Sequence, residues 1–201
     1  MRVTALAIGL VLAGAPAAMA QATAATARAQ AVPGAADWRT VPADNLMIID
    51  TSRGRILVEL APQAAPLHVE RMRLLTRRAF FDGIVFHRVI DGFMAQTGDV
   101  SNGKAGGDLS MAGMGGSSKP DLPAEFTNDL SFQRGVVGMA RANDPNSANS
   151  QFFIMFGDGS FLDGQYTIVG NVVSGMEAVD AIQRGEPPAT PDVMTKVTVQ
   201  D

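Results

Sequence analysis

The sequence predicts a mainly β domain, arranged as a barrel or a sandwich of many short strands. Three observations lead to this prediction. Short apolar runs with strand-like alternation recur from position 46 onward, turn residues such as Gly, Pro, Asn and Ser separate them, and two segments have helical spacing. The 201 residues are enough for one domain with a sizeable core, and 46% hydrophobic with 18% charged residues is typical of a globular protein.

The N-terminus reads as a secretory signal. Arg2 supplies a minimal positive charge, and residues 5–15 form a short apolar core. Ala18-Met19-Ala20 has the small-x-small pattern of a cleavage site before Gln21. An uncleaved membrane anchor is the alternative, but this run is short and rich in Ala and Gly, whereas a span needs roughly 20 strongly apolar residues.

This pattern divides the chain into three parts. We expect a signal peptide over 1–20, a flexible leader over 21–40 that is rich in Ala, Thr and Gln, and a folded domain over 41–201. Cleavage after Ala20 would make the protein periplasmic or secreted in a bacterial cell, with no membrane attachment.

Strands are predicted wherever short apolar runs lie between turn residues. The first two, over 46–50 and 56–60, flank the turn Ser52-Arg53-Gly54 and should form a hairpin. The remaining strands are expected over 84–90, 93–97, 136–140, 151–156, 166–173 and 193–199. Phe152 and Phe153 are neighbours on one strand, so they must face opposite ways, and one of them belongs to the core.

The first predicted helix begins at Pro66, because proline is well placed at a first helical position. Val69 and Met72 then place apolar groups on one face. The arginines on the other faces are interpreted as solvent-exposed rather than as an anion site: Arg71, Arg73, Arg77 and Arg78. His68 is also expected on the helix surface.

The other segments are a second helix and two polar loops. The helix is expected after Ser174, whose spacing to Glu177 fits a capping box. The Gly-rich segment 104–120 lacks the phosphate-binding pattern G-x-x-x-x-G-K-[ST] and leads into no helix, so it is predicted to be a loop without phosphate. Residues 143–146 lack the glycine and glutamate of an EF-hand and are predicted to form a tight polar turn.

Composition excludes several classes of function. A net charge of −4 gives no nucleic-acid footprint. The absence of cysteine excludes disulfides, thiolate zinc sites and cysteine nucleophiles. We expect no metal and no cofactor, and the chain is expected to be a monomer.

The most informative segment is FHRVIDGFMAQTGD, residues 86–99. Read as a strand, it places Phe86, Arg88 and Ile90 on one face and His87 with Val89 on the other. A guanidinium cannot shed its charge, so it is rarely buried without a partner or a task.

The residues after Arg88 add to this picture. Phe93, Met94 and Gln96 follow within eight positions, which suggests an apolar pocket with one fixed cation and one amide at its edge. Such a set contains no nucleophile, acid–base pair or metal ligands, so its chemistry should rest on polarisation and shape. The alternatives are that Arg88 is a structural ion-pair partner and that the phenylalanines are core. His87 is expected to be a packed core histidine.

At these residues the chain resembles the cyclophilins, the barrel-shaped peptidyl-prolyl cis–trans isomerases. The motifs run in the family's order over about residues 45–200: FHRVIDGFMAQTGD, a Gly-rich loop, RGVVGMARANDPNSANSQFFIMF, and FLDGQYTIVGNVVSGMEAVDAI. The resemblance implies a closed antiparallel β-barrel of about eight strands capped by two α-helices. It implies a cofactor-free isomerase that acts on proline-containing unfolded or extended polypeptides; a non-catalytic proline-peptide binding module or chaperone on the same fold is the alternative.

The resemblance also assigns roles residue by residue. It makes Arg88, Phe93 and Gln96 catalytic, with Gln96 holding the arginine and the peptide backbone. The pocket for the proline ring would be lined by Phe93, Met94, Phe153, Leu162 and Tyr166. The groove for the residues before the proline would be formed by Ala140, Arg141, Ala142 and Gln151.

This chain departs from the family's pattern at four positions. Phe161, also assigned to the substrate site, stands where many eukaryotic members have tryptophan, so an indole donor for the inhibitor cyclosporin is lost. Tyr166 replaces a histidine but can still wall the pocket and donate a hydrogen bond. Met114 replaces a polar loop residue, which predicts a smaller and more apolar neighbouring pocket, and Asp144 lengthens a turn by one residue.

Overall fold

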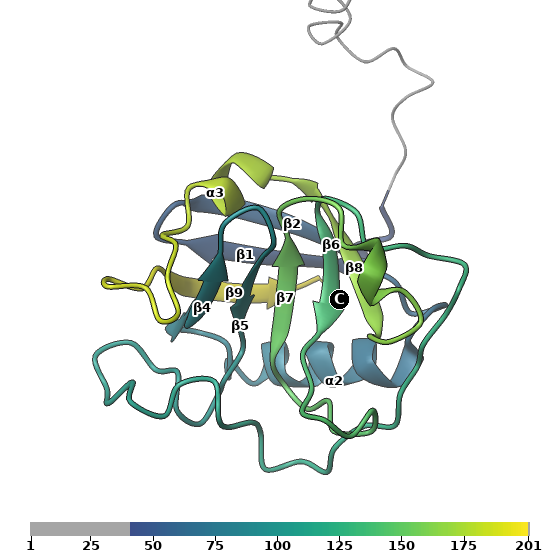
Figure 1. Cartoon of the computed structure of the whole chain (residues 1–201), viewed down its shortest axis with the longest axis horizontal. Helices are drawn as coiled ribbons and strands as arrows, with labels where there is room; N and C mark the ends of the chain where they lie inside the picture. Colours follow the sequence, from purple (N-terminus) through teal and green to yellow (C-terminus); the bar gives the residue numbers. More distant parts are fainter. Residues whose placement is uncertain (1–40, 201) are drawn as a thin grey trace, which may run out of the picture. The chain divides into compact units, whose positions relative to one another are not determined.

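A computed structural model describes residues 41–200; the predicted signal peptide and leader lie outside the described residues. Figure 1 shows the arrangement of the helices and strands. The strands are β1 (Leu46–Thr51), β2 (Gly54–Leu60), β3 (Ile84–Val85), β4 (Arg88–Ile90), β5 (Met94–Thr97), β6 (Val136–Met139), β7 (Phe152–Met155), β8 (Ile168–Ser174) and β9 (Val193–Val199). The α-helices are α2 (Pro66–Arg77) and α3 (Met176–Asp180), and the short 3₁₀ turns are η2 (Ala43–Asn45) and η3 (Ser160–Leu162).

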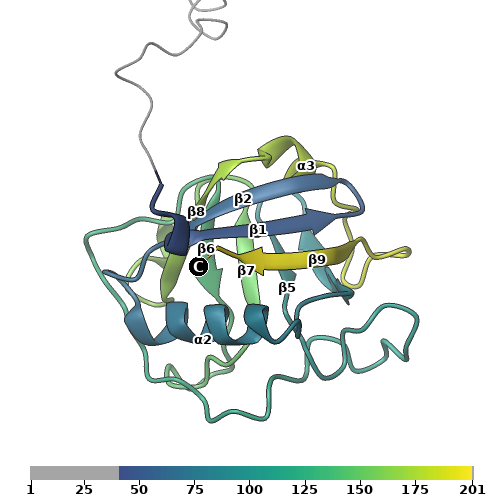
Figure 2. The ribbon, with the colours of Figure 1, turned by 180° about the vertical axis from the view of Figure 1, so that it is seen from behind.

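One antiparallel sheet contains all nine strands, in the order β3-β9-β1-β2-β8-β6-β7-β5-β4. The sheet curls over so that β1, β2 and β9 run across β5, β6 and β7 (Figures 1 and 2). The predicted hairpin forms β1 and β2, with Leu46 opposite Glu59 and Thr51 opposite Gly54. The mainly β prediction is therefore confirmed.

The predicted closure of the barrel is wrong, because β3 and β4 are the two edges of the sheet and do not pair with each other. Both edges pair with irregular segments instead. The N–H of Val85 donates to the carbonyl of Gly103 at 2.9 Å, and Val89 and Gly185 exchange two backbone hydrogen bonds of 2.8 Å. The result is a half-barrel whose edges are covered by loops.

The single strand predicted over 84–90 is interrupted at Phe86 and His87, and the structure has two shorter strands there, β3 and β4. The N–H of Phe86 donates to the carbonyl of Asp192 at 2.9 Å, which extends the pairing of β3 with β9 by one residue, and β4 begins at Arg88. Phe86 is fully buried in the main core, whereas Ile90 packs against a different cluster. The expectation that Phe86 shares a face with Arg88 and Ile90 was therefore wrong.

Alternation along β7 separates two hydrophobic clusters. Phe152 and Ile154 face the main core, which fills the space inside the half-barrel. Phe153 and Met155 face the other way and join a smaller cluster with Met94 of β5. The smaller cluster is completed by Phe132 and Ile168. The main core makes the fold, and the second cluster lies under the candidate site described below.

Helix α2 begins at Pro66 as predicted and buries Val69 and Met72. Three of its polar residues were misplaced by the sequence prediction, among them Arg73, whose side chain is 16% exposed and donates to the Oδ1 of Asn45 at 2.7 Å. His68 is fully buried, with its Nδ1 2.6 Å from the Oε2 of Glu125. Arg71 is also buried, and its guanidinium donates to the carbonyl oxygen of Pro120 at 2.8 Å. Loops cover this part of the helix, a tertiary contact that helical periodicity does not reveal.

Helices α2 and α3 lie at opposite ends of the half-barrel in both views (Figures 1 and 2), and both pack against the main core. The N-cap of α3 is Gly175, in the left-handed conformation with φ of 90°, and no side chain caps it. The predicted capping box from Ser174 is therefore wrong, because Ser174 is still part of β8. Among residues 41–200, no helix has the length and apolar character that crossing a membrane requires.

Candidate active site

A cavity of about 240 Å³ opens between β4, β5, β7 and the segment after η3. The residues that line it are Arg88, Phe93, Met94, Gln96, Ala140, Arg141, Phe153, Leu162 and Tyr166. All nine belong to the set of site residues predicted from the sequence. Four separate stretches of the chain thus meet at one small cavity, whose walls combine aromatic and aliphatic side chains with two arginines.

The floor of the cavity is aromatic. Phe153 stacks on Phe132, with ring centroids 5.7 Å apart, and meets the ring of Tyr166 edge-on at 5.9 Å. Gly138 lies opposite Phe153 in the pairing of β6 with β7. A Cβ atom there would come within 2.6 Å of both phenylalanine rings, so glycine leaves the space that they occupy.

Arg88 provides the charge in this apolar setting. It lies on β4, and its Nε donates a hydrogen bond of 3.1 Å to the Oε2 of Glu186. Its side chain is 41% exposed, so it is a cation at the mouth of the cavity and not a buried structural ion. A guanidinium so placed can donate to a polar group of a bound molecule.

Gln96 does not make the contact that the resemblance implies. It lies opposite Arg88 in the pairing of β4 with β5, but its Nε2 donates to the Oε1 of Gln151 at 2.9 Å. Within residues 41–200, the hydrogen-bond partner of Arg88 is Glu186 rather than Gln96. The expected holding of the arginine by Gln96 is thus replaced by a carboxylate from another part of the chain.

A second, larger cavity of about 500 Å³ lies beside the first. Gln96, Ala140 and Arg141 line both, so the two cavities adjoin along these residues, and together they are called the groove. Ala142 and Gln151, predicted to bind the residues before a proline, line this second cavity, and so does Met114. Met114 is 77% exposed at this wall, and a smaller, more apolar pocket than in other family members stays a prediction.

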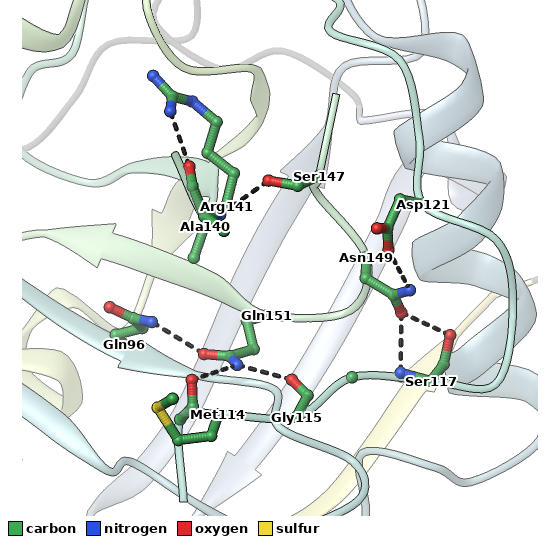
Figure 3. Close-up of a pocket in the computed structure, with 13 residues that line it drawn as sticks. Gln96, Met114, Gly115, Ser117, Asp121, Ala140, Arg141, Ser147, Asn149 and Gln151 are labelled. Carbon is green, nitrogen blue, oxygen red and sulfur yellow. Dashed lines mark hydrogen bonds between the residues drawn. The ribbon is translucent and has the colours of Figure 1, made fainter. Parts of the chain in front are cut away.

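Gln151 ties the two walls of the second cavity together (Figure 3). While its Oε1 accepts from Gln96, its Nε2 donates to the carbonyl oxygens of Gly113 at 2.9 Å and Gly115 at 2.7 Å. Across the cavity, the Oδ1 of Asn149 accepts from the N–H of Ser117 at 2.8 Å. The Gly-rich segment has no regular structure, but hydrogen bonds from Gln151 and Asn149 hold it in place. It therefore forms a fixed wall of the groove.

Asp99 fixes the same segment from below. Its fully buried carboxylate accepts backbone N–H groups of Ser101 at 3.1 Å and Asn102 at 2.9 Å on one oxygen, and of Gly113 at 2.8 Å and Gly115 at 2.9 Å on the other. Burial acts to raise the pKa of Asp99, but these four donors outweigh burial and hold the pKa below its ordinary value. The carboxylate is thus an ionised anchor for the loop.

His87 is buried, as predicted for a packed core histidine, and it lines neither cavity. Burial lowers the pKa of its imidazole, and the nearby Asp99 carboxylate opposes this only in part. The ring is therefore neutral at neutral pH and is not placed to exchange a proton with a molecule in the groove.

Phe161 is the predicted site residue that lines neither cavity. Its side chain is 62% exposed, and its ring centroid lies 5.6 Å from that of Phe93. The Tyr166 ring has a different neighbour, because the guanidinium of Arg141 lies over it, 4.5 Å from the ring centre. Because it lies beside Phe93 but outside the 240 Å³ cavity, Phe161 adds apolar surface next to that cavity.

Sequence reasoning missed Glu186 and Asp99. Glu186 lies between Gly185 and two prolines, a pattern that marks a fixed turn but does not say what the turn faces. Asp99 closes the FHRVIDGFMAQTGD motif, but its backbone partners appear only when the loop is folded. Among residues 41–200, no group of three or more His, Asp or Glu side chains is arranged to hold a metal ion.

Comparisons with known proteins identify the family of this chain. Residues 46–200 match the family described as cyclophilin type peptidyl-prolyl cis-trans isomerase/CLD. A probable peptidyl-prolyl cis-trans isomerase of Brucella suis is 52% identical over 164 residues, which cover 78% of this chain and 83% of that protein.

Two solved structures are similar in fold. A cyclophilin from Hirschia baltica has a TM-score of 0.70 and 30% identity, covering 81% of this chain and 76% of that one. A cyclophilin type isomerase from Cryptosporidium parvum, crystallised in the presence of the dipeptide Ala-Pro, has a TM-score of 0.68 and covers 78% of this chain and 99% of that one. At 24% identity, the second comparison supports the fold alone.

Proposed function

The chain belongs to the cyclophilin-type peptidyl-prolyl cis-trans isomerase family, and from this premise we propose that it catalyses X-Pro rotation in exported polypeptides, using the Arg88 cavity. The single observation that carries the assignment of the site is that cavity: a hollow of about 240 Å³ that brings the guanidinium of Arg88 together with aromatic and aliphatic side chains.

The chemistry follows from the barrier to be lowered. An X-Pro bond rotates over a barrier of about 20 kcal/mol, because nitrogen lone-pair resonance with the carbonyl is lost in the twisted state. The nitrogen then becomes pyramidal and more basic, so a donor aimed at it stabilises the twisted state more than the planar one. Lowering the barrier by about 7 kcal/mol would accelerate rotation roughly 10⁵-fold.

The residues of the cavity divide this work. Phe153, Met94 and Tyr166 hold the proline ring by apolar contact. Arg88 supplies the charged donor, and no proton needs to move between groups. Phe93 closes the cavity beside Arg88, with Phe161 against its outer face.

The second cavity would receive the residues that precede the proline. A substrate in extended form would lie along the shared wall of Gln96, Ala140 and Arg141, and would add backbone hydrogen bonds as an added strand does. Proline-containing unfolded polypeptides are therefore the proposed partners, and since proline isomerisation can limit folding, the enzyme would act as a folding catalyst.

Export is proposed from the sequence of residues 1–20, with cleavage after Ala20 and a periplasmic or secreted product. Mass spectrometry of the protein purified from its own cells tests this directly. A mass that begins at Gln21, in the periplasmic fraction or the medium, is expected. An intact Met1 in the membrane fraction would replace export with anchoring.

Activity is tested with the purified protein and an Ala-X-Pro-Phe peptide in an assay that cleaves the trans form. We expect the cis-to-trans rate to rise in proportion to enzyme concentration. A peptide that binds without any change in its isomerisation rate would point to the binding-module alternative.

A further inference from the structure

We propose that Glu186 is a positioning residue for Arg88: its carboxylate holds the guanidinium in the orientation that serves X-Pro rotation. The inference rests on the proposed function, because it explains how the catalytic arginine of that site is aimed. It assigns to Glu186 the part that the family resemblance gave to Gln96.

The hydrogen bonds of the site support this exchange of partners. The Nε of Arg88 donates to the Oε2 of Glu186 at 3.1 Å, whereas Gln96 is turned to Gln151. No other side chain among residues 41–200 forms a hydrogen bond with Arg88. Without Glu186, the long arginine side chain would have many rotamers open to it.

Glu186 reaches Arg88 from a turn that is fixed to the same strand. Val89, the next residue of β4, exchanges two backbone hydrogen bonds of 2.8 Å with Gly185. Gly185 has a φ of 149°, and a Cβ atom there would come within 2.5 Å of the Cα of Pro188. Only glycine suits this close turn, which therefore delivers the next side chain to Arg88.

The other end of this segment is also held. The buried Asp192 accepts hydrogen bonds from the hydroxyl of Ser52 at 2.6 Å and from the N–H of Gln183 at 2.8 Å. The segment that carries Glu186 is thus pinned at Gln183, Gly185 and Asp192. Because the backbone around Glu186 is held in place, its carboxylate can fix the orientation of the Arg88 guanidinium. A carboxylate on a freely moving loop could not do so.

The atom that Glu186 uses matters for catalysis. A hydrogen bond at Nε sets the plane of the guanidinium, while both terminal amino groups remain to donate to a peptide. The two side chains are 41% and 51% exposed, so solvent screens most of their Coulomb attraction. The effect of Glu186 should therefore be on orientation, and it should be felt in kcat more than in KM.

A neighbouring ion pair offers a matched control. Asp91 accepts a hydrogen bond of 3.0 Å from Arg184, and both residues flank the same turn and strand. This pair is also solvent-exposed, but it involves no residue that lines either cavity. Asp91→Asn removes one carboxylate near the site without touching the partner of Arg88.

The test compares the kcat and KM of Glu186→Ala, Glu186→Gln, Asp91→Asn, Arg88→Ala and the double variant Arg88→Ala/Glu186→Ala. We expect Glu186→Ala to lower kcat about five- to tenfold with KM within about twofold, as for lost orientation. Glu186→Gln still offers an oxygen to Nε and should keep at least about half of the wild-type kcat. Asp91→Asn should match the wild type, and in the double variant the loss of Glu186 should add nothing to the loss of Arg88.

The outcomes separate this inference from the proposed function. If Arg88→Ala is inactive but Glu186→Ala keeps the wild-type kcat, the positioning role is overturned and the proposed function stands. Equal losses in Glu186→Ala and Asp91→Asn, a loss confined to KM, or additive losses in the double variant would also overturn it. Wild-type turnover by Arg88→Ala would instead overturn the proposed function. The Nε–H resonance of Arg88 provides a check independent of activity: it should shift in Glu186→Ala and not in Asp91→Asn.

Discussion

Arg88 could be recognised from the sequence because its charge stands among apolar residues that a strand must partly bury. The cavity-lining set around it was also predictable by resemblance, since motif order carries over to position. Its partner was not predictable. Glu186 lies 98 residues away along the chain, and only the folded turn brings it to the guanidinium.

At the same scale, the neutral state of His87 predicts how the rate depends on pH. Burial lowers the pKa of this imidazole below the ordinary histidine value of about 6.5, so the ring remains uncharged from about pH 7 to 8.5. The rate constant for peptide isomerisation should therefore change less than about twofold across this range. A bell-shaped profile centred near neutrality would show that a titrating group takes part, with His87 the first to be replaced.

Phe161 predicts a response to cyclosporin, the cyclic peptide inhibitor of many cyclophilins. Its exposed ring lies beside Phe93 but has no N–H to donate where sensitive members carry tryptophan. An inhibitor carbonyl would lose its partner, at a cost of about 1–3 kcal/mol or roughly ten- to a hundredfold in affinity. Phe161→Trp should lower the inhibition constant of cyclosporin by that factor. Equal inhibition constants for wild type and Phe161→Trp would contradict the assignment of Phe161 to the inhibitor-binding site.

At the scale of elements, the side-chain alternation of a strand was predictable from the sequence, but the burial of helix residues under distant loops was not. The alternation of Phe152 and Phe153 follows from the strand itself, and the structure places them in separate clusters. The burial of His68 and Arg71 depends on Glu125 and Pro120, which come from a loop about fifty residues later. Nothing in the helix alone signals that cover.

Asp99 is the anchor of an element, the Gly-rich loop, and its replacement tests that role. In Asp99→Asn, an amide NH₂ would face the N–H groups of Gly113 and Gly115, so two donors would meet without an acceptor. The free energy of unfolding at neutral pH should fall by about 1–3 kcal/mol, and KM should rise because Gly113 and Gly115 also hold Gln151.

The pH dependence of the stability lost in Asp99→Asn is a second test of the ionised anchor. Because the pKa of folded Asp99 is lowered, its contribution to stability is fully present above the unfolded pKa of about 3.9. The contribution is lost as the pH falls through the lower folded value. Urea unfolding at pH 7 and pH 3 should show a large difference between wild type and Asp99→Asn at pH 7 and a smaller one at pH 3. A difference that grows on acidification would contradict an ionised anchor.

At the scale of the whole folded unit, the sequence predicted the fold class but not the closure of the sheet. The approximate positions of the strands follow from apolar periodicity and turn residues, whereas closure depends on whether β3 and β4 meet. They do not: β3 and β4 are the two edges of the sheet, and they bond to Gly103 and Gly185 instead of to each other. The same departure from a closed barrel places the Gly185 turn against β4, next to the candidate site.

The central claim for the molecule is that its sheet holds the guanidinium of Arg88 beside a small cavity with aromatic and aliphatic walls, and that this cation lowers the barrier to X-Pro rotation. The most direct measurement is the kcat/KM for one proline peptide of wild type, Arg88→Ala and Arg88→Lys, with folding verified by circular dichroism. Arg88→Ala should lose on the order of 10²-fold or more, because the twisted nitrogen loses its charged donor. Arg88→Lys should recover little, since an ammonium cannot reproduce the planar fork. A folded Arg88→Ala protein with wild-type kcat/KM would contradict the account.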